Sequence, residues 1–298
     1  MRSRLFHAGV VFVPVASLGL TCLPSSADEV AEVAPAPVGT DERARLPLWE
    51  LGVAAAAVTV PDYPGADRNR LRALPLPYGI YRGKTLRADD EGVRSRYRFS
   101  PSAELDLSFG GALPADSRGN AARAGMPDLD VMLEVGPQLT LLLAEPVRGA
   151  SWRLALPVRA VFSTDFSNFR SRGLLLAPEL SYARTKVGNS AWTSSLALGS
   201  SFGTAPLTRY FYEVAPEFAR PDRPAYTAES GYLESSLTAA VSRLFGDKLT
   251  VFSFLRGTSL HGAANADSPL LRDEFNLTVG VGFTYSLRRS RETVSAED

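Results

Sequence analysis

Apolar and polar side chains alternate most clearly from Asn276 to Leu287, near the end of the chain. Every second residue from Leu277 to Leu287 is apolar, and the residues between them are Gly, Ser or Thr. Because successive side chains of a strand point to opposite faces, one face here is wholly apolar and the other is small and polar. This division is typical of a membrane β-barrel strand, which has lipid on one side and a polar interior on the other.

The same alternation recurs throughout residues 48–287, in runs of about 10 to 16 residues, which is the length that tilted membrane strands need. The predicted lipid-facing positions include Leu105, Leu107, Leu139, Leu141, Leu154, Leu156, Leu196, Leu198, Leu233 and Leu237. One run, 249–260, has no clear phase because the neighbours Val251 and Phe252 are both apolar. A soluble sandwich is disfavoured, since its strands rarely oppose bulky apolar groups to a face of only Gly, Ser and Thr.

The segments between these runs alternate in length. Short connections are predicted at 145–149, 187–190 and 245–248, and long ones at 110–128, 164–172, 204–229 and 261–271. Outer-membrane barrels have short periplasmic turns and longer outer loops. The sequence therefore predicts an all-β, transmembrane, antiparallel up-and-down β-barrel of about ten strands, with both ends of the chain on the periplasmic side. The connection at 83–93 is long for a turn, and a further hairpin there or inside 204–229 would make twelve strands.

The N-terminus has the form of a cleaved secretory signal. Arg2 and Arg4 precede an apolar run over 5–20, and small residues lead to a predicted cleavage site after Ala27. A membrane anchor is the alternative, but the run is short; Cys22 suggests a lipoprotein, but the residues before it fit a lipidation box poorly. We expect residues 1–27 to be a signal peptide, 28–47 a flexible leader, 48–287 the barrel and 288–298 a charged tail.

Charge and reactive residues narrow the possible functions. The chain has 298 residues, with 32 basic and 32 acidic side chains, so no net field favours nucleic acid. Its one cysteine leaves with the signal peptide, and His261 is the one histidine that remains. We therefore predict neither a cofactor nor a metal site.

Charged side chains occur on the faces predicted to point inward. A charge facing lipid at mid-depth costs about 2 to 4 kcal/mol for Arg, so these side chains belong in the lumen. The predicted lumenal polar network consists of Glu104, Asp106, Glu134, Arg153, Arg159, Glu179 and Glu234. One interpretation is an acid and arginine network that stabilises the interior. The other is a small pore or ligand site lined by Arg153, Arg159, Glu134 and Glu179.

Two short patterns raise the possibility of an enzyme. Gly199 to Gly203 has the G-x-S-x-G spelling of a nucleophile elbow, but it lies within an alternating strand rather than at the sharp turn that this motif requires. Ser259 and His261 would suit an outer-membrane lipid hydrolase, but they are about 7 Å apart along a strand and no orienting acid is evident. We predict no catalytic residues.

Several phrases in the loops and strands resemble the MipA/OmpV family of outer-membrane proteins. They are Pro61 to Asp67, Pro75 to Tyr78 with Tyr81 and Arg82, Tyr210 to Val214, Pro224 to Ala228 with Gly231, Ala266 to Leu270, and the closing Gly282 to Leu287. Two features depart from the family pattern. Leu287 stands where the final strand usually ends on an aromatic residue, and the tail Arg288 to Asp298 follows it.

The resemblance implies a non-enzymatic barrel in the outer membrane of a Gram-negative cell. The named member of the family is a scaffold that joins a lytic murein transglycosylase to a penicillin-binding protein, and other members are described as adhesins or porin-like proteins. We therefore predict a scaffold in cell-wall remodelling, with a narrow channel or adhesin as the alternative and a lipid hydrolase as a weaker one. The predicted topology places the Tyr210 and Ala266 phrases outside, whereas a murein enzyme lies in the periplasm.

Overall fold

The computed structural model describes residues 45–82, 86–89, 92–95, 97–100, 102–144, 150–185 and 192–295. The predicted signal peptide, leader residues 28–44 and the predicted short connections at 145–149 and 187–190 lie outside the described residues.

Nearly all of the described chain belongs to one antiparallel sheet of fourteen strands. These strands are β2 (Trp49–Pro61), β3 (Asn69–Arg82), β4 (Leu86–Asp89), β5 (Gly92–Ser95), β6 (Tyr97–Ser100), β7 (Ala103–Ala112), β8 (Val131–Ala144), β9 (Ala150–Thr164), β10 (Phe169–Leu176), β11 (Glu179–Thr185), β12 (Trp192–Gly203), β13 (Gly231–Phe245), β14 (Leu249–Ser259) and β15 (Phe275–Arg289). A separate pair, β1 (Arg45–Pro47) and β16 (Thr293–Ser295), forms a two-stranded sheet.

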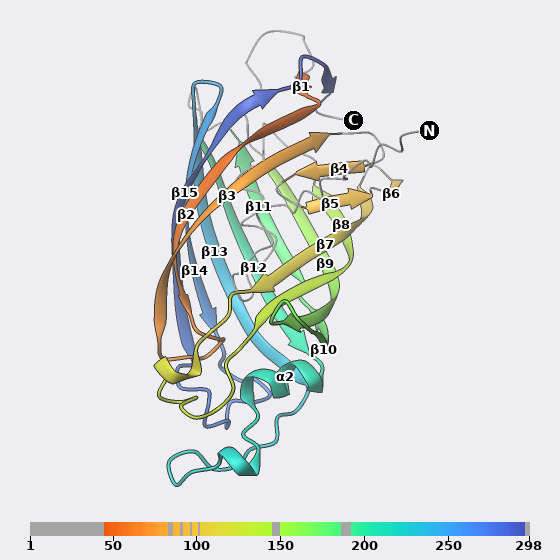
Figure 1. The fold of residues 1–298 in the computed structure, drawn as a ribbon. Helices are drawn as coiled ribbons and strands as arrows, with labels where there is room; N and C mark the ends of the chain where they lie inside the picture. Colours follow the sequence, from red (N-terminus) through yellow and green to blue (C-terminus); the bar gives the residue numbers. More distant parts are fainter. Residues whose placement is uncertain are drawn as a thin grey trace, which may run out of the picture.

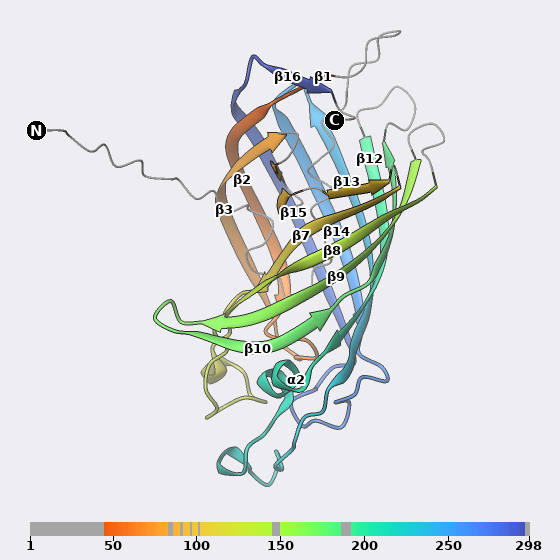
Figure 2. The same cartoon turned by 90° about the vertical axis from the view of Figure 1, so that its right-hand side faces the viewer.

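The sheet winds into a barrel (Figures 1 and 2). The last long strand, β15, pairs with the first, β2, from Val279 opposite Thr59 to Arg289 opposite Glu50. At the other end of the strand order, β5 lies against β7. Barrel closure removes the exposed sheet edges that invite aggregation. The prediction of an antiparallel β-barrel is confirmed.

Two interruptions explain the strand count. Between β10 and β11, Ala177 N–H still donates to Pro157 O at 3.2 Å, and Ser200 N–H donates to Pro178 O at 3.0 Å, so the break remains bonded to both neighbouring strands. Two residues separate β10 from β11, and one residue separates β5 from β6. If β10 and β11 are counted as one interrupted strand, and β5 and β6 as another, the sheet has twelve strands instead of fourteen. Twelve is the alternative count that the sequence predicts when a further hairpin forms near 83–93. The extra hairpin is β4 paired with β5.

The outer surface of the strands is apolar. Leu196, Leu198, Leu237, Leu255 and Val281 each expose about half of their side chains. Towards the end that carries the termini, Trp152 and Trp192 are exposed, and Trp152 lies 4.9 Å from Tyr182 between ring centroids. Towards the opposite end, Phe202 contacts Tyr232, with ring centroids 5.7 Å apart. Aromatic girdles at both edges of an apolar band are the mark of a membrane barrel.

The long connections lie at one end of the barrel, and the first and last described residues, in β1 and β16, lie at the other, which we call the end with the termini (Figure 1). The end with the termini carries the three-residue turn between β13 and β14 and the β1–β16 sheet. The other end carries the connections at 113–130, 204–230 and 260–274. The 204–230 connection contains helix α2 (Ala205–Tyr212), which the sequence did not predict because eight residues are too few to show a helical period. Two short 3₁₀ helices, Ser117–Gly119 and Pro216–Phe218, also lie in these connections.

Within the described ranges, no helix has both the length and the apolarity to cross a membrane.

The predicted long loop at 164–172 is mostly strand. β9 continues to Thr164 and β10 begins at Phe169, which leaves four residues as a turn. Thr164 Oγ1 accepts the N–H of Phe166, and Asp165 Oδ1 accepts those of Ser167 and Asn168, each at 2.8 to 2.9 Å. Polar side chains that accept backbone N–H groups stabilise tight turns. This polar segment therefore forms a short turn, although its composition suggested a long loop.

The interior explains the strand whose phase was unclear. On β14, Phe252 and Phe254 point inward and lie opposite Gly282 and Gly280 of β15. A Cβ on either glycine would overlap the facing ring. The small inward face of β15 therefore provides room for two phenyl rings, which pack with Val58 and other apolar side chains inside the barrel.

One predicted lipid-facing residue, Leu233, lies inside instead. The β12–β13 register shifts between Ser201 opposite Glu234 and Phe202 opposite Tyr232, so Leu233 is an extra residue. A bulge of this kind turns a side chain to the other face. Leu233 is buried, and its neighbour Glu234 also points into the lumen.

Candidate functional site

A layer of paired charges crosses the lumen. Arg159 on β9 and Glu134 on β8 form an ion pair at 3.2 Å, and Arg159 Nε donates to Ser108 Oγ at 2.9 Å. Both charged side chains are at least nine-tenths buried. Two buried charges are tolerated when each has a partner and further hydrogen bonds, as here.

A second pair joins β13 to β14. Arg256 Nη2 donates to Glu234 Oε1 at 3.1 Å, and Arg256 Nε donates to Thr258 Oγ1 at 3.2 Å. Arg256 was missing from the predicted network because the phase of its strand was not recognised. Phe252 and Phe254 lie opposite the inward glycines of β15. This correspondence would have identified the inward face of β14, to which Arg256 also belongs.

A small cavity with both apolar and charged walls lies between these pairs. Its walls include Arg159, Glu179, Glu234 and Arg256, together with Ser201 and Ser236. Its space for the centres of water-sized molecules is about 30 Å³. A buried water needs at least about 10 to 15 Å³ by this measure, so two or three waters or a solute of similar size fit.

Three other predicted network residues lie apart from this cavity. Asp106 is buried on β7, opposite Gln138. Glu104 and Arg153 are partly buried and lie closer to the termini, with Glu104 opposite Thr140 and Arg153 opposite Ser181. The structure thus brings Glu134, Arg159, Glu179 and Glu234 together and leaves Glu104, Asp106 and Arg153 elsewhere along the wall.

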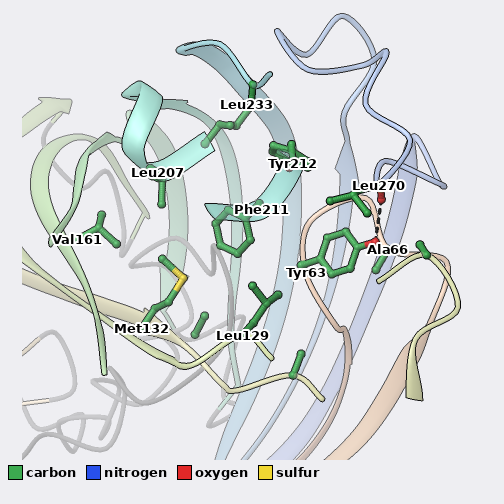
Figure 3. Close-up of a cluster of buried hydrophobic side chains, with 14 of the residues drawn as sticks. Tyr63, Ala66, Leu129, Met132, Val161, Leu207, Phe211, Tyr212, Leu233 and Leu270 are labelled. Atoms are coloured by element: carbon green, nitrogen blue, oxygen red, sulfur yellow. Dashed lines mark hydrogen bonds between the residues drawn. The ribbon is translucent and has the colours of Figure 1, made fainter. Parts of the chain in front are cut away.

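At the loop end, apolar side chains pack into a cluster that we call the lid (Figure 3). Inward residues of the strand ends, including Met132, Val161 and Leu233, meet residues of the long connections. The lid consists of Tyr63, Ala66, Ala112, Ala115, Ala122, Leu129, Met132, Val161, Leu175, Leu207, Phe211, Tyr212, Val214, Ala228, Leu233 and Leu270. Because strands from several sides of the barrel contribute, the lid packs across the loop end of the lumen.

Hydrogen bonds join the loops of the lid to one another. Tyr63 OH donates to Leu270 O at 2.7 Å, and Tyr212 OH donates to Pro64 O at 3.2 Å. Ser268 Oγ donates to Tyr212 O at 2.7 Å. Burial raises the pKa of the Tyr63 phenol well above its ordinary value, so the hydroxyl stays protonated and remains a donor. These bonds connect three loops that are far apart in the chain.

Two buried arginines hold further loop carbonyls. Arg123 Nη1 donates to Phe211 O at 3.1 Å, and its guanidinium lies 5.6 Å from the centre of the Tyr63 ring. Burial lowers the pKa of Arg123 below its ordinary value, but the side chain stays charged because that value is so high. Arg223 Nη1 donates to Ala122 O at 2.8 Å and Nη2 to Phe218 O at 2.7 Å. Such charge-assisted bonds satisfy backbone groups that would otherwise be buried without partners.

Four of the six phrases that carry the family resemblance meet at the lid. Tyr63 and Pro64 belong to the first phrase, Tyr212 to the third, and Ser268 and Leu270 to the fifth. Val214 of the third phrase and Tyr226 of the fourth form an isolated β-bridge. These phrases therefore specify contacts between loops that are far apart in the chain. The alternation of apolar and polar residues along the sequence does not show which loops meet.

The enzyme patterns acquire no catalytic geometry among the described residues. Ser201 lies within β12 and points into the lumen rather than standing at a turn. His261 Nδ1 lies 3.4 Å from Glu274 Oε2, and both side chains are exposed. Ser259 Oγ accepts the backbone N–H of His261 at 3.4 Å, and no contact joins this hydroxyl to the imidazole. Among all the residues that the structure describes, no group of three or more His, Cys, Asp and Glu residues is arranged to hold a metal ion.

At the end with the termini, charged residues continue past the predicted close of the barrel. β15 extends to Arg289, whose guanidinium contacts Glu50 at 3.4 Å and Asp247 at 3.5 Å. Leu48 N–H then donates to Glu292 O at 2.9 Å, beside the β1–β16 pair. Residues 289–295 therefore connect the C-terminal segment to the N-terminal one at the rim.

Comparisons with known proteins give a family. The family model described as "MltA-interacting protein MipA" matches residues 53–287. Among solved structures, the chain is similar to one described as "Bacterial polysaccharide outer membrane secretin", with 9% identity, a TM-score of 0.39, and coverage of 81% of this chain and 99% of that one. It is also similar to "Outer-membrane expressed OmpT of Vibrio cholerae", with 9% identity, a TM-score of 0.36, and coverage of 82% and 100%. The comparison with curated proteins gave no match.

Proposed function

Because the chain belongs to the MltA-interacting protein MipA family, we propose that it is a non-enzymatic outer-membrane barrel that binds a lytic transglycosylase at its periplasmic end. In the full form of the proposal, it also binds a penicillin-binding protein and so brings a murein hydrolase and a murein synthase together. The family description supports an interacting protein rather than an enzyme.

The apolar outer band supports a membrane location. Trp192 and Phe202, one in each girdle, are ten residues apart on β12. Ten residues span about 33 Å along a strand, and a tilt of about 40° reduces this to roughly 25 Å. That height equals the apolar band of outer-membrane barrels. Because short turns are periplasmic in such barrels, the end with the termini faces the periplasm and the lid faces outward.

The family match carries the proposal, and the lid removes one objection to it. The loop phrases that resemble the family serve to pack the outer loops, so their outer location does not conflict with a periplasmic partner. A closed outer end also argues against a permanently open pore. The periplasmic rim, with Asp247, Arg289 and the β1–β16 pair, is the surface that we assign to the partner.

Affinity purification tests this assignment. Tagged full-length protein, solubilised from native membranes at native expression, is expected to recover a lytic transglycosylase, and Asp247→Arg together with Lys248→Glu is expected to reduce that recovery severalfold. The matched control is Asp222→Arg, which changes an exposed acid on the outer loops. Recovery of neither a murein hydrolase nor a synthase would refute the scaffold role. If only Asp222→Arg reduced the recovery of the partner, the interface would lie on the outer loops and the assigned rim would be wrong.

A further inference from the structure

The cavity between the two ion pairs contains hydrogen-bond donors that have no partner. Arg256 is 5% exposed and Ser201 is 5% exposed, and both line the cavity. Within the described ranges, neither Arg256 Nη1 nor Ser201 Oγ has a hydrogen-bond partner. Leaving a buried polar group without a hydrogen bond costs about 1 to 3 kcal/mol of stability, and more if the group is charged. A small molecule in the cavity that accepts hydrogen bonds from both groups would remove this cost.

The charges around the cavity limit what that acceptor belongs to. The wall itself carries two guanidiniums, of Arg159 and Arg256, and two carboxylates, of Glu179 and Glu234, while Glu134, the ion-pair partner of Arg159, is not part of the wall. A simple anion would meet two carboxylates, and a simple cation would meet two guanidiniums. A solute that carries both charges is attracted by both kinds of wall.

The shape of the wall also indicates a place for such a solute. The cavity lies beside Pro178, where β10 and β11 are interrupted, and beside Gly199 of β12. A Cβ added to Gly199 would lie 3.2 Å from Ser236 Oγ and 3.8 Å from Glu179 Oε2. The missing side chain therefore leaves space between a hydroxyl and a carboxylate.

We propose that this cavity binds a small zwitterionic amino acid, with its carboxylate at Arg256 Nη1 and Ser201 Oγ and its ammonium group towards Glu179. The available space admits a solute of the size of glycine. Leu175 belongs both to the cavity wall and to the lid, so the bound solute lies directly beneath the lid. This site is independent of the periplasmic interface proposed above.

Saturation-transfer difference NMR on the detergent-solubilised, full-length barrel tests the site with three probes: glycine, acetate and glycinamide. Glycine is expected to give a saturable signal, while acetate, which lacks the ammonium group, and glycinamide, which lacks the carboxylate, bind at least tenfold more weakly. Ser201→Ala, which removes a hydroxyl that makes no hydrogen bond to the described residues, is expected to weaken glycine binding about tenfold. Gly199→Ala is expected to weaken it as well by occupying the space.

Ser195→Ala is the matched control, because Ser195 is a buried, inward serine on the same strand but nearer the periplasmic end. It is expected to leave glycine binding unchanged, and heat-modifiable migration shows that each variant is folded. If none of the probes binds the folded protein, the cavity holds water alone and the proposal is wrong. Acetate binding as tightly as glycine would identify an anion site instead. Glycine binding that survives both Ser201→Ala and Gly199→Ala would place it elsewhere on the protein.

Discussion

The inward glycines of β15 are positions where a missing side chain determines the packing. Gly280 and Gly282 face Phe254 and Phe252, and each ring occupies the space where a Cβ would stand. Gly52 of β2 faces Tyr78 of β3 in the same manner. The alternation of small and apolar residues correctly predicted which face of β15 is inward. It could not predict that aromatic rings fill that face, because the rings belong to another strand.

The buried pair of Arg159 and Glu134 gives a prediction at the residue scale. Arg159→Met should lower the free energy of unfolding by about 3 to 5 kcal/mol, because Glu134 is left as a buried charge. Adding Glu134→Gln should restore much of that loss, since the charge is then removed. Denaturant unfolding of the solubilised barrel, followed by tryptophan fluorescence, measures both effects.

Arg118→Ala is the control for this pair. Arg118 and Asp116 also lie 3.2 Å apart, but Arg118 is largely exposed and Asp116 partly so, so no measurable change in stability is expected. Equal losses from Arg159→Met and Arg118→Ala would show that burial is not what makes the lumenal pair important.

Strands were predictable in this chain because their outward faces are uniform. Leu105, Leu107, Leu196 and Leu198 all lie outside as their alternation indicated. Leu233 did not follow its pattern, because a bulge depends on how two strands pair and not on one strand's sequence. Helix α2 was missed for a related reason: its buried face, which includes Leu207 and Phe211, is specified by loops distant in the chain.

Strand β15 offers a prediction at the element scale. Val281 lies near the middle of its outward face and is 53% exposed, while Leu287 lies near the rim and is 58% exposed. In the membrane, Val281→Arg should cost about 2 to 4 kcal/mol and Leu287→Arg about 0 to 1 kcal/mol, because the cost of a charge depends on its depth. Reversible folding into lipid vesicles measures the two values. Similar costs for both variants would contradict the assigned depth of the apolar band.

For the whole molecule, the lid determines whether the lumen can conduct. Wild-type protein in planar bilayers is expected to show little conductance, because the apolar cluster packs across the outer end of the barrel. Replacing residues 205–229 by a short Gly-Ser linker should raise the conductance severalfold, since Leu207, Phe211 and Tyr212 are then removed from the cluster. A Glu217→Gln variant, which changes one residue of the same connection outside the buried cluster, should behave as wild type. A closed channel after the replacement would show that the charged layer alone seals the lumen.

The bonds of the lid also have a consequence for the order of folding. Tyr63 and Leu270 are 207 residues apart in the chain, and the Gly65 N–H that donates to Asn276 Oδ1 spans 211 residues. A contact between residues so far apart in the chain has a large loop-closure entropy cost when the residues between them are unfolded. Such a contact is therefore stable only after the intervening strands have formed. The lid can therefore assemble only after β15 has paired with β2. Until then the outer loops stay open to proteases, so their resistance to cleavage reports that a molecule has completed its barrel.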